Sequence, residues 1–481
     1  MNFERRRRII DFLNNAEKQY PVNEWILNDI KIWPLIRICI FFNEYHRETV
    51  LKDSRIKGLV KKLFKFFGFS YLYGFYNLIK IKIDKSDFLF AGFEAHRAVL
   101  EQQSYNKYFD PIMNELEKRG KKSILFEYLP ITYSNSNTIY KKERVHNIYN
   151  LLYFFKVNSN EMRYRNFSSI DDFFEKLNND LSIDIESLQN FINGFYNNAL
   201  SWERLWTYLL KKTEPNKVFI LNYYSSSALG LVLASKKNNV TCIDMQHGGQ
   251  GAVHIAYSYS NIPKGGYTLL PDYFWCWDTS SFAHLQKITY GTAHSVVAGG
   301  NPWVQFLSNV NVSLKQNGGK PLILFTLQTG QQPFIDDYLL KTIVATKENY
   351  DWWLRLHPRT KKEEKEDLLK LLDAYNLKDF VEIEKATAYP LPLILMNAKV
   401  HLTLFSGSAI EAAALNVPLN IIIGETGKEF FNELIQSRKA LYFEKIDPDD
   451  FLILLNKELS NHTYENDRVV LDYKRTLNNF I

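Results

Sequence analysis

Two histidines of this sequence stand directly behind short apolar runs, where an imidazole can take a proton from a substrate. His247 follows the run Thr241–Met245 and is succeeded by Gly248 and Gly249. An unperturbed histidine has a pKa near ~6.5, so much of it is neutral and able to act as a general base at neutral pH. Glycines can adopt positive φ and let the backbone approach a ligand. We interpret His247 as the candidate catalytic base that deprotonates an acceptor hydroxyl.

The same turn offers further ligand groups. Gln246, Gly248 and Gly249 are candidate acceptor or loop residues, and His254 is a weaker candidate for the base. The alternative is a histidine whose ring nitrogens only satisfy loop carbonyls. The glycine-rich turn around His247 favours the functional interpretation.

A second histidine, His357, lies in a basic segment behind the apolar run 352–354. Pro358 ends strand pairing there, and Arg355, His357 and Arg359 offer donors for charge-assisted hydrogen bonds to phosphate. A basic solvated loop is the alternative, because lysines follow at positions 361 and 362. Two arginines on either side of a histidine favour a site for the phosphate of a donor substrate.

A third segment, Ser406-Gly407-Ser408, separates the run 400–404 from the alanine-rich stretch 409–415. Small hydroxyl residues at a helix start expose backbone N–H groups and the positive end of the helix dipole, which suit an anion. Glu411, in the first turn, can accept hydrogen bonds from ribose hydroxyls, as acidic residues do in dinucleotide-binding folds. Simple N-capping is the alternative, and it is compatible with anion binding.

These segments need a scaffold that brings strand ends together. Apolar runs alternate with stretches of helical spacing, and we expect strands at 88–93, 123–128, 218–222, 240–246, 273–277 and 295–298, then at 322–327, 352–356, 381–383, 400–404 and 419–423. Such alternation indicates parallel sheets covered by helices on both faces, with ligand groups at the carboxyl ends of the strands. We predict an α/β chain with two doubly wound, Rossmann-like domains facing one another across a cleft.

The domain boundaries follow from the same pattern. Residues 1–83 look helical without a clear strand, residues 84–300 form a Rossmann-like acceptor domain, and Gly299-Gly300-Asn301-Pro302 is the linker candidate. Residues 301–481 then form a Rossmann-like nucleotide-donor domain with C-terminal helices. A length of 481 residues supports this division, because one hydrophobic core seldom organises so long a chain.

Composition excludes several classes of protein. The net charge of +6 is too small to indicate a nucleic-acid partner, and the three cysteines show no CxxC pair, so neither a disulfide framework nor a zinc site is supported. No Walker A, HExxH or GxSxG element occurs. Asp447-Pro448-Asp449 formally contains a metal-binding Asp-X-Asp, which we interpret as a helix cap. We expect no metal site.

The N-terminal region suggests contact with a membrane surface without crossing it. The first residues lack the continuous apolar core of a signal peptide, and no run reaches the eighteen or so apolar residues of a spanning helix. Segment 55–83 interleaves lysines with aromatic residues such as Phe64, Phe66 and Phe67. Such a segment can lie in a lipid interface, and a core-packed helix pair with a basic outer face is the alternative. We expect a cytoplasmic protein, with peripheral contact on the inner face of the cytoplasmic membrane as the open alternative to core packing of this segment.

The quoted motifs resemble those of a known superfamily. His357-Pro358 and Ser406-Gly407-Ser408 are similar to the donor-phosphate motifs of bacterial GT-B transferases of surface polysaccharide synthesis, namely capsule sialyltransferases, Kdo transferases and teichoic-acid glycerophosphotransferases. His247-Gly248 resembles a His-Gly element of the glycerophosphotransferases, whose histidine is implicated in catalysis. The resemblance spans roughly residues 84–430 by order and spacing.

The resemblance implies a GT-B fold and a glycosyltransferase of capsule, O-antigen or lipopolysaccharide synthesis. It implies metal-independent transfer of a sugar from a nucleotide-activated donor, CMP- or CDP-linked, to a hydroxyl of a growing, lipid-linked glycan, with no cofactor besides the donor. The acidic base motif of several sialyltransferases is absent, so Glu94 and Glu101, after the first strand, are the candidate substitute carboxylates, with an exposed helical position as the alternative for Glu101. Three alternatives stay open: a UDP-sugar transferase, a nucleotide-sugar epimerase and a noncatalytic glycan-binding assembly protein.

Overall fold

The chain forms two compact units. The computed structural model describes residues 3–50, 83–93, 96–100, 103–128, 145–157, 164, 167–309, 314, 319–329, 334–357, 360–460 and 471–481. Unit 1 comprises Met1–Arg97, Ser104–Pro302 and Leu471–Ile481, and unit 2 comprises Ala98–Gln103 and Trp303–Val470. The main division therefore follows the Gly299–Pro302 segment.

Unit 1 is built on a seven-stranded parallel sheet with the order β11-β10-β9-β8-β3-β6-β7. In that order, the strands are β11 (Ser295–Ala298), β10 (Tyr273–Cys276), β9 (Thr241–Met245), β8 (Lys217–Ile220), β3 (Phe88–Gly92), β6 (Ser123–Glu127) and β7 (Val145–Asn147). The residues of the four central strands β9, β8, β3 and β6 are mostly apolar and nearly all buried, as expected for strands that helices cover on both faces.

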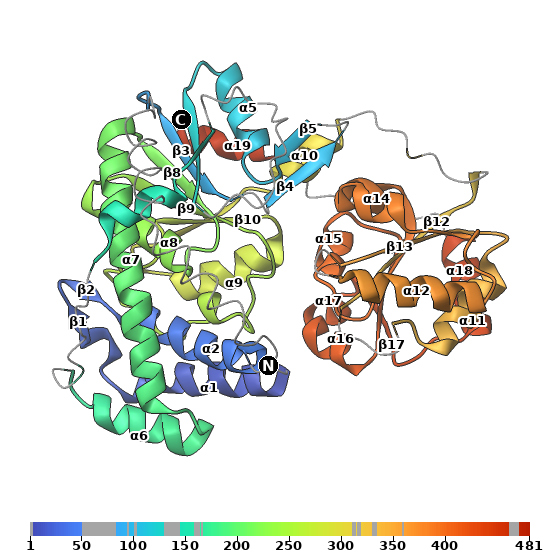
Figure 1. Cartoon of the computed structure of the whole chain (residues 1–481), viewed down its shortest axis with the longest axis horizontal. Coiled ribbons are helices and arrows are strands. Elements are labelled where there is room, and N and C mark those ends of the chain that lie inside the picture. Colours follow the sequence, from blue (N-terminus) through green and yellow to red (C-terminus); the bar gives the residue numbers. More distant parts are fainter. Residues whose placement is uncertain are drawn as a thin grey trace, which may run out of the picture. The chain divides into compact units, whose positions relative to one another are not determined.

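Alternate residues of these strands enter two separate cores. Leu89, Ile220 and Cys242 pack with α1 (Phe3–Gln19), α2 (Trp33–Val50), α6 (Ile170–Leu181), α7 (Ile185–Thr213) and α8 (Ser226–Lys237). Phe90 and Phe219 face the other way and stack at 5.1 Å between ring centroids, in the core that includes α5 (Asp110–Lys118) and α19 (Tyr473–Leu477). Figure 1 shows α7 as the long green helix that runs along this unit. Unit 1 also contains α9 (Thr279–Thr289).

The N-terminal helices belong to the core of unit 1. Ile9, Leu13, Trp33 and Ile36 are buried in the same cluster as the apolar face of α7. The described part of the expected extension, residues 3–50, is therefore packed into the core of this unit. It also contains a short antiparallel pair, β1 (Ile26–Leu27) and β2 (Ile30–Lys31), so the expectation that residues 1–83 hold no strand is wrong.

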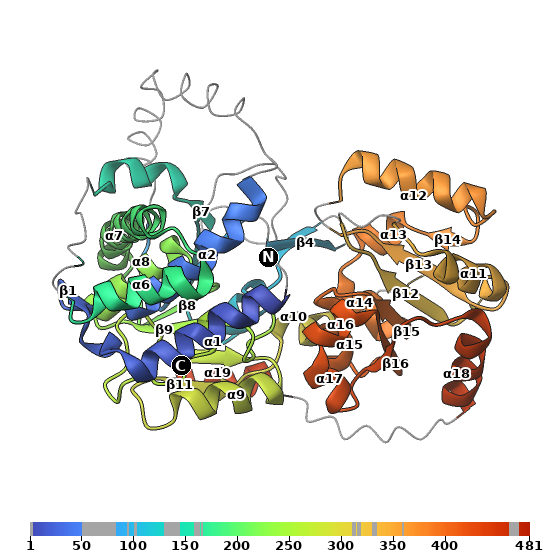
Figure 2. The ribbon, with the colours of Figure 1, turned by 90° about the horizontal axis from the view of Figure 1, so that it is seen from below.

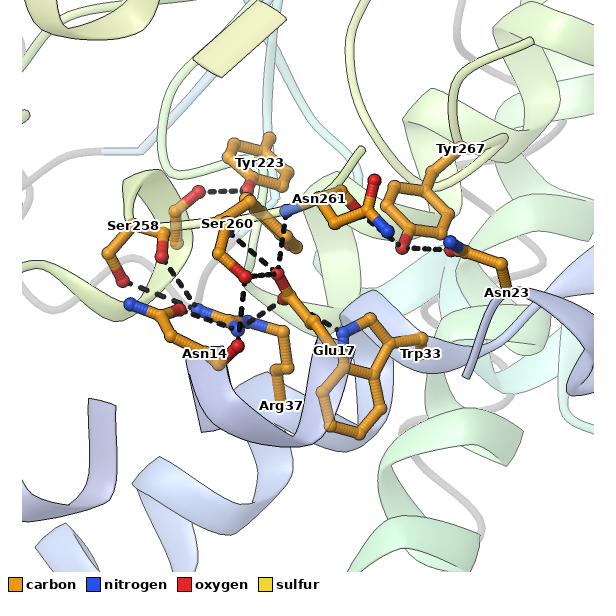
Figure 3. A network of polar contacts seen from close by, with 12 residues as sticks. Asn14, Glu17, Asn23, Trp33, Arg37, Tyr223, Ser258, Ser260, Asn261 and Tyr267 are labelled. Carbon is orange, nitrogen blue, oxygen red and sulfur yellow. Dashed lines mark hydrogen bonds and ion pairs between the residues drawn. The ribbon is translucent and has the colours of Figure 1, made fainter. Parts of the chain in front are cut away.

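A buried carboxylate fastens these helices to a distant loop (Figure 3). Glu17 of α1 accepts hydrogen bonds from Trp33 Nε1 at 2.9 Å, Arg37 Nη1 at 2.5 Å and the backbone N–H groups of Ser260 and Asn261 at 2.7 and 2.9 Å. Both members of the Glu17–Arg37 ion pair are 0% exposed. The loop that follows His254 is thus held by the N-terminal helices.

Unit 2 has a six-stranded parallel sheet with the order β14-β13-β12-β15-β16-β17. In that order, the strands are β14 (Val381–Glu382), β13 (Asp351–Arg355), β12 (Leu322–Thr326), β15 (Ala398–Thr403), β16 (Leu419–Ile423) and β17 (Leu441–Phe443). Its helices are α11 (Asp337–Thr346), α12 (Lys362–Ala374), α13 (Glu384–Ala388), α14 (Leu391–Asn397), α15 (Ser408–Ala414), α16 (Glu425–Phe430), α17 (Asn432–Gln436) and α18 (Pro448–Ser460). Figure 2 displays this unit from below.

The chain contains two Rossmann-like α/β domains, the pair of domains that makes up a GT-B fold. This confirms the predicted fold class. The expectation that the domains face one another across a cleft stays a prediction. The remaining elements are β4 (Arg97–Leu100), β5 (Gln103–Asn106) and α10 (Pro302–Leu307).

The expected donor-domain boundary at 481 needs correction. Residues Leu471–Ile481 return to unit 1, where Tyr473, Leu477 and Phe480 are buried against α5 and the sheet. Three apolar side chains in eleven residues drive this return, and the sequence pattern gave no sign of their partner. Asp447 Oδ1 accepts the N–H of Asp450 at 2.9 Å, so the Asp-Pro-Asp segment does cap α18.

The interfacial segment predicted at 55–83 lies outside the described residues, except for residue 83. Within the described part of the chain, no helix is both long enough and apolar enough to span a bilayer.

Candidate functional site

The carboxyl edge of each sheet contains a point where the strand order reverses. In unit 1, the chain passes from β3 to β6 on one side, whereas β8 lies on the other side of β3. The connections that leave β3 and β8 therefore run in opposite directions. Ligands of open parallel sheets bind at such topological switch points, where loops leave the sheet in opposite directions. The residues that follow β3, β8 and β9 are therefore placed where substrate can enter.

A His-Tyr-His cluster occupies this point in unit 1. Tyr224 Oη, behind β8, lies 3.1 Å from His247 Nε2 and 3.4 Å from His254 Nε2. The backbone N–H of Ala256 donates to His254 Nδ1 at 3.3 Å. The two histidines expected near each other are thus joined through a tyrosine that the sequence analysis did not single out.

These contacts fix where the protons of the cluster lie. Because His254 Nδ1 accepts a hydrogen bond, the neutral ring carries its proton on Nε2, which donates to Tyr224 Oη. The Tyr224 hydroxyl then donates to His247 Nε2, and His247 carries its own proton on Nδ1. That nitrogen is buried, and the Met245 backbone favours the protonated form of the ring. The basic nitrogen of His247 is therefore Nε2.

Burial keeps both imidazoles neutral. Desolvation, with the positive charge of Lys107, lowers the pKa of His247 to about 4. Desolvation, with the charges of His247 and Arg6, lowers the pKa of His254 to about 3. A neutral imidazole is the form that can accept a proton, and its lowered pKa makes it a weaker base than an unperturbed histidine.

His96 extends the cluster toward β3. This histidine is 7% exposed, its Nδ1 has no hydrogen-bond partner, and its ring packs 5.1 Å from that of Tyr108. Desolvation, together with the charges of His247 and Lys107, lowers the pKa of His96 well below its usual value. Tyr108 in turn stacks on Trp277, whose buried Nε1 also lacks a partner.

Of the two roles expected for Gln246, acceptor contact or loop, its contacts support the loop role. Gln246 is 0% exposed, and its amide contacts Gly248 O, Asp278 Oδ2, Ser281 Oγ and Trp277 N at 2.6 to 3.1 Å. It therefore ties the loops after β9 and β10 together, because its polar atoms are used within the protein. Gly248 does not have positive φ, contrary to expectation, and an added Cβ would meet no atom within 4 Å. The open space beside it leaves room for a ligand. Gly249 is exposed.

Unit 2 has its switch point between β12 and β15, since β13 lies on the other side of β12. Thr326 pairs with Arg355 on one side and with Thr403 on the other, which places the segments after Arg355 and Thr403 at one edge of the sheet. The predicted donor residues lie in these two segments and in the helix that follows the second.

A buried polar network supports this edge. Thr326 Oγ1 lies 2.7 Å from Ser408 Oγ and 3.1 Å from His401 Nε2, while His401 Nδ1 lies 2.8 Å from Asn420 Oδ1. Asn420 Nδ2 donates to the Ala409 carbonyl, so Oδ1 accepts from His401 Nδ1. Ser408 thus turns its hydroxyl inward, because burial leaves it no access to solvent. Ser406 and Gly407 remain accessible at the edge.

The carboxylate of Glu411 acts electrostatically on the guanidinium of Arg355. Desolvation lowers the pKa of Arg355, and the Glu411 carboxylate counteracts this. Arg355 Nη1 donates to the carbonyls of Ala386 at 2.5 Å and Tyr389 at 2.7 Å, so part of the guanidinium anchors the neighbouring segment. His357 is partly exposed at the end of the same strand.

Four predicted site residues lie outside the described residues: Glu94, Glu101, Pro358 and Arg359. In the other direction, the sequence analysis missed Tyr224, His96 and the Thr326–His401 pair. Tyr224 could have been predicted as a site residue, because it lies two residues after the expected strand 218–222. His247 has a similar position after the expected strand 240–246. His401 lies inside an apolar strand, where nothing in the sequence distinguishes a structural histidine from a ligand.

A hollow of about 610 Å³ in unit 1 lies at the opposite edge of the sheet, beside Phe88, Lys217 and Thr241 at the amino ends of β3, β8 and β9. Ligand groups gather at the carboxyl ends of parallel strands, so we assign this hollow no role. The described residues include no group of three or more His, Cys, Asp or Glu that could hold a metal ion.

Comparison with known proteins gives distant similarities only. No family model and no curated protein sequence matches the chain. Among solved structures, UDP-GlcNAc 2-epimerase of Neisseria meningitidis bound to UDP-GlcNAc is 11% identical with a TM-score of 0.48, over 82% of this chain and 98% of that one. The wall teichoic acid polymerase TagF is 11% identical with a TM-score of 0.44, over 89% and 97%. UDP-GlcNAc 2-epimerase of Methanocaldococcus jannaschii is 14% identical with a TM-score of 0.46, over 82% and 98%. These matches assign no activity to this chain.

Proposed function

We propose that this protein is a metal-independent glycosyltransferase that moves a sugar from a nucleotide-activated donor to a hydroxyl of a bacterial surface glycan. One observation carries the proposal: a neutral His-Tyr-His cluster lies at the switch point of unit 1, and basic and hydroxyl residues lie at the equivalent point of unit 2. A base near the acceptor and donors for a leaving phosphate are the two groups that glycosyl transfer needs.

Donor recognition is assigned to unit 2. Arg355, His357 and Arg359 would neutralise the donor phosphate, with Pro358 fixing their turn, and the backbone at Ser406-Gly407-Ser408 would add N–H donors. Glu411 would accept hydrogen bonds from the ribose. The motifs favour a CMP- or CDP-linked sugar over a UDP-linked one. No cofactor besides the donor is required.

Acceptor activation is assigned to unit 1. The acceptor hydroxyl would take the place of the Tyr224 hydroxyl at His247 Nε2 and give that nitrogen its proton. Its oxygen then bonds to the anomeric carbon while the bond between that carbon and the phosphate oxygen breaks, and the nucleotide leaves with the electron pair. Glu94 is the second candidate for the base.

The acceptor we propose is a lipid-linked glycan of capsule, O-antigen or lipopolysaccharide synthesis, which suits a cytoplasmic protein bound peripherally to the membrane through residues 55–83. Lysines beside aromatic residues in that segment would favour anionic head groups.

The test separates donor binding from catalysis. Thermal shifts with CMP, CDP, UDP and GDP identify the nucleotide, because a bound ligand stabilises the folded state by mass action. His247→Ala is expected to keep that thermal shift and to lower turnover about a hundredfold or more. His357→Ala is expected to reduce the shift itself. His284→Ala is the matched control, because it removes a histidine of unit 1 whose Nε2 lies 2.7 Å from the Tyr257 carbonyl oxygen.

Other outcomes would replace the proposal. Conversion of the donor to an isomer without any acceptor would show an epimerase. A His247→Ala variant that fully complements a deletion strain would show a noncatalytic glycan-binding protein. The absence of any nucleotide-dependent shift would remove the assignment to unit 2.

A further inference from the structure

A buried aspartate, Asp244, lies within the sheet that carries the His-Tyr-His cluster. It belongs to β9, and its strand neighbours are Ile220 of β8 and Phe274 of β10. Its side chain is 0% exposed. A carboxylate among apolar strands costs free energy unless hydrogen bonds replace the water that it has lost. The hydrogen-bond partners of Asp244 therefore indicate why a carboxylate is kept there.

The carboxylate binds both segments that carry the cluster. Asp244 Oδ1 accepts the backbone N–H of Tyr223 at 3.3 Å, and Tyr223 immediately precedes Tyr224. Asp244 Oδ2 accepts the hydroxyl of Tyr257 at 2.8 Å. Tyr257 is the last residue of a short 3₁₀ helix whose N-cap is His254. One side chain thus joins the turn after β8 to the loop after β9.

Further contacts between the same two segments fix the ring of His254. Tyr223 Oη donates to the Ala256 carbonyl oxygen, and the backbone N–H of Ala256 donates to His254 Nδ1 at 3.3 Å. The ring centroid of Tyr257 lies 4.8 Å from that of His254 and 6.1 Å from that of Tyr224. The packed ring and the backbone donor together leave His254 Nε2 as the nitrogen that contacts the Tyr224 hydroxyl.

The hydrogen bonds of Asp244 have a direction that its amide analogue cannot reproduce. An ionised carboxylate only accepts, so both Tyr223 N–H and Tyr257 O–H donate to it. An asparagine offers one acceptor and one donor group. With its oxygen on the Tyr223 N–H, its NH₂ group would face the Tyr257 oxygen, and the Tyr257 hydroxyl proton would have to turn away.

We propose that Asp244 is a positioning residue that holds the loop of His254 against the turn of Tyr224. By keeping these segments in place, it fixes the proton of His254 on Nε2 and directs the Tyr224 hydroxyl to His247 Nε2. It acts through the two tyrosines that donate to it. Its role in transfer rests on the proposed function, whereas its effect on the histidine tautomers does not.

The first experiment records the ring nitrogens of His254 and His247 by ¹⁵N NMR of the full-length protein without substrate. Burial raises the pKa of Asp244 to about 7, so the spectra are taken at about pH 8, where the carboxylate is ionised. We expect one tautomer for each ring, protonated on Nε2 in His254 and on Nδ1 in His247. Asp244→Asn and Tyr257→Phe should each move the His254 signals towards a mixture of both tautomers. Tyr267→Phe is the matched control, because it removes the hydroxyl of another buried tyrosine of unit 1.

The second experiment measures the role in transfer. Asp244→Asn is expected to lower kcat at least about tenfold and to change the KM of the donor less than about twofold, because a misplaced base slows the chemical step. The nucleotide-dependent thermal shift, which reports on unit 2, should stay as in the wild type. The double variant Asp244→Asn, Tyr257→Phe should lose no more activity than the more affected single variant, because both changes remove the same hydrogen bond.

The outcomes are distinct from those that test the proposed function. Retention of a single His254 tautomer in both Asp244→Asn and Tyr257→Phe would overturn the positioning role, and so would an equal change in Tyr267→Phe. Losses of activity that multiply in the double variant would also overturn it, because the two residues would then act separately. If Asp244→Asn does not fold, Tyr257→Phe decides alone, since it removes only a hydroxyl. A protein that transfers no sugar at all would contradict the proposed function and leave the tautomer experiment valid.

Discussion

Replacement of Glu17 by Ala is expected to destabilise unit 1 by about 3 to 5 kcal/mol, because it leaves the buried Arg37 guanidinium without its counter-ion. Both side chains are 0% exposed, and the carboxylate also accepts hydrogen bonds from Trp33, Ser260 and Asn261. An exposed ion pair behaves differently. Lys85 and Glu214 lie 2.7 Å apart but are 73% and 56% exposed, so Lys85→Ala should cost no more than about 1 kcal/mol.

Urea unfolding measures the two costs, and hydrogen exchange locates them. In Glu17→Ala, the amides of residues 258–261 should lose protection while peptides of unit 2 exchange as before, since the lost bonds lie within unit 1. The double variant Glu17→Met, Arg37→Met should recover part of the loss, because it removes the unpaired charge. A cost for Glu17→Ala no larger than that of Lys85→Ala would refute the reasoning about burial.

Two further predictions concern pH and membranes. The pKa of His401 is lowered to about 4 by burial, so the unfolded chain takes up the proton first, and stability is lost as pH falls from about 6.5 towards 4. Urea unfolding at several pH values should show that the stability lost over this pH range is smaller in His401→Gln by up to about 3 kcal/mol. An unchanged loss would contradict the burial of a neutral ring. Replacing Phe64, Phe66 and Phe67 with Ser should release the protein from anionic liposomes and spare transfer to a soluble acceptor. Unchanged sedimentation with liposomes would exclude the interfacial segment.

Most strands of both sheets could be predicted because each is a short, mainly apolar run between stretches of helical spacing. All eleven expected strands occur, with ends that differ by two residues or fewer. The missed strands β7 and β17 lie at sheet edges, and their residues are only partly buried, so the local apolar signal is weak. The return of residues 471–481 to unit 1 depends on tertiary partners that no local pattern reveals.

The site was predictable in position more than in contacts. Strand ends mark where ligand groups lie, and this placed His247, Arg355 and Ser406 at sheet edges. Which polar atoms face inward depends on packing: Gln246 and Ser408 look like ligands in sequence but are buried and hydrogen-bonded within the protein. Glu17 could not be connected with Ser260 at all, because their contact arises from the packing of α1 and α2 against a loop far along the chain.

The position of α1 and α2 changes what the N-terminal region means for function. Their apolar faces complete the core of unit 1, Glu17 holds the loop after His254, and the Phe42 ring of α2 lies 6.1 Å from the ring of Tyr224. The residues expected to lie in the membrane interface follow α2 directly in sequence. A deletion intended to make the protein independent of membranes must therefore begin after α2, because removal of the first fifty residues would take away a packing neighbour of Tyr224 together with part of the core.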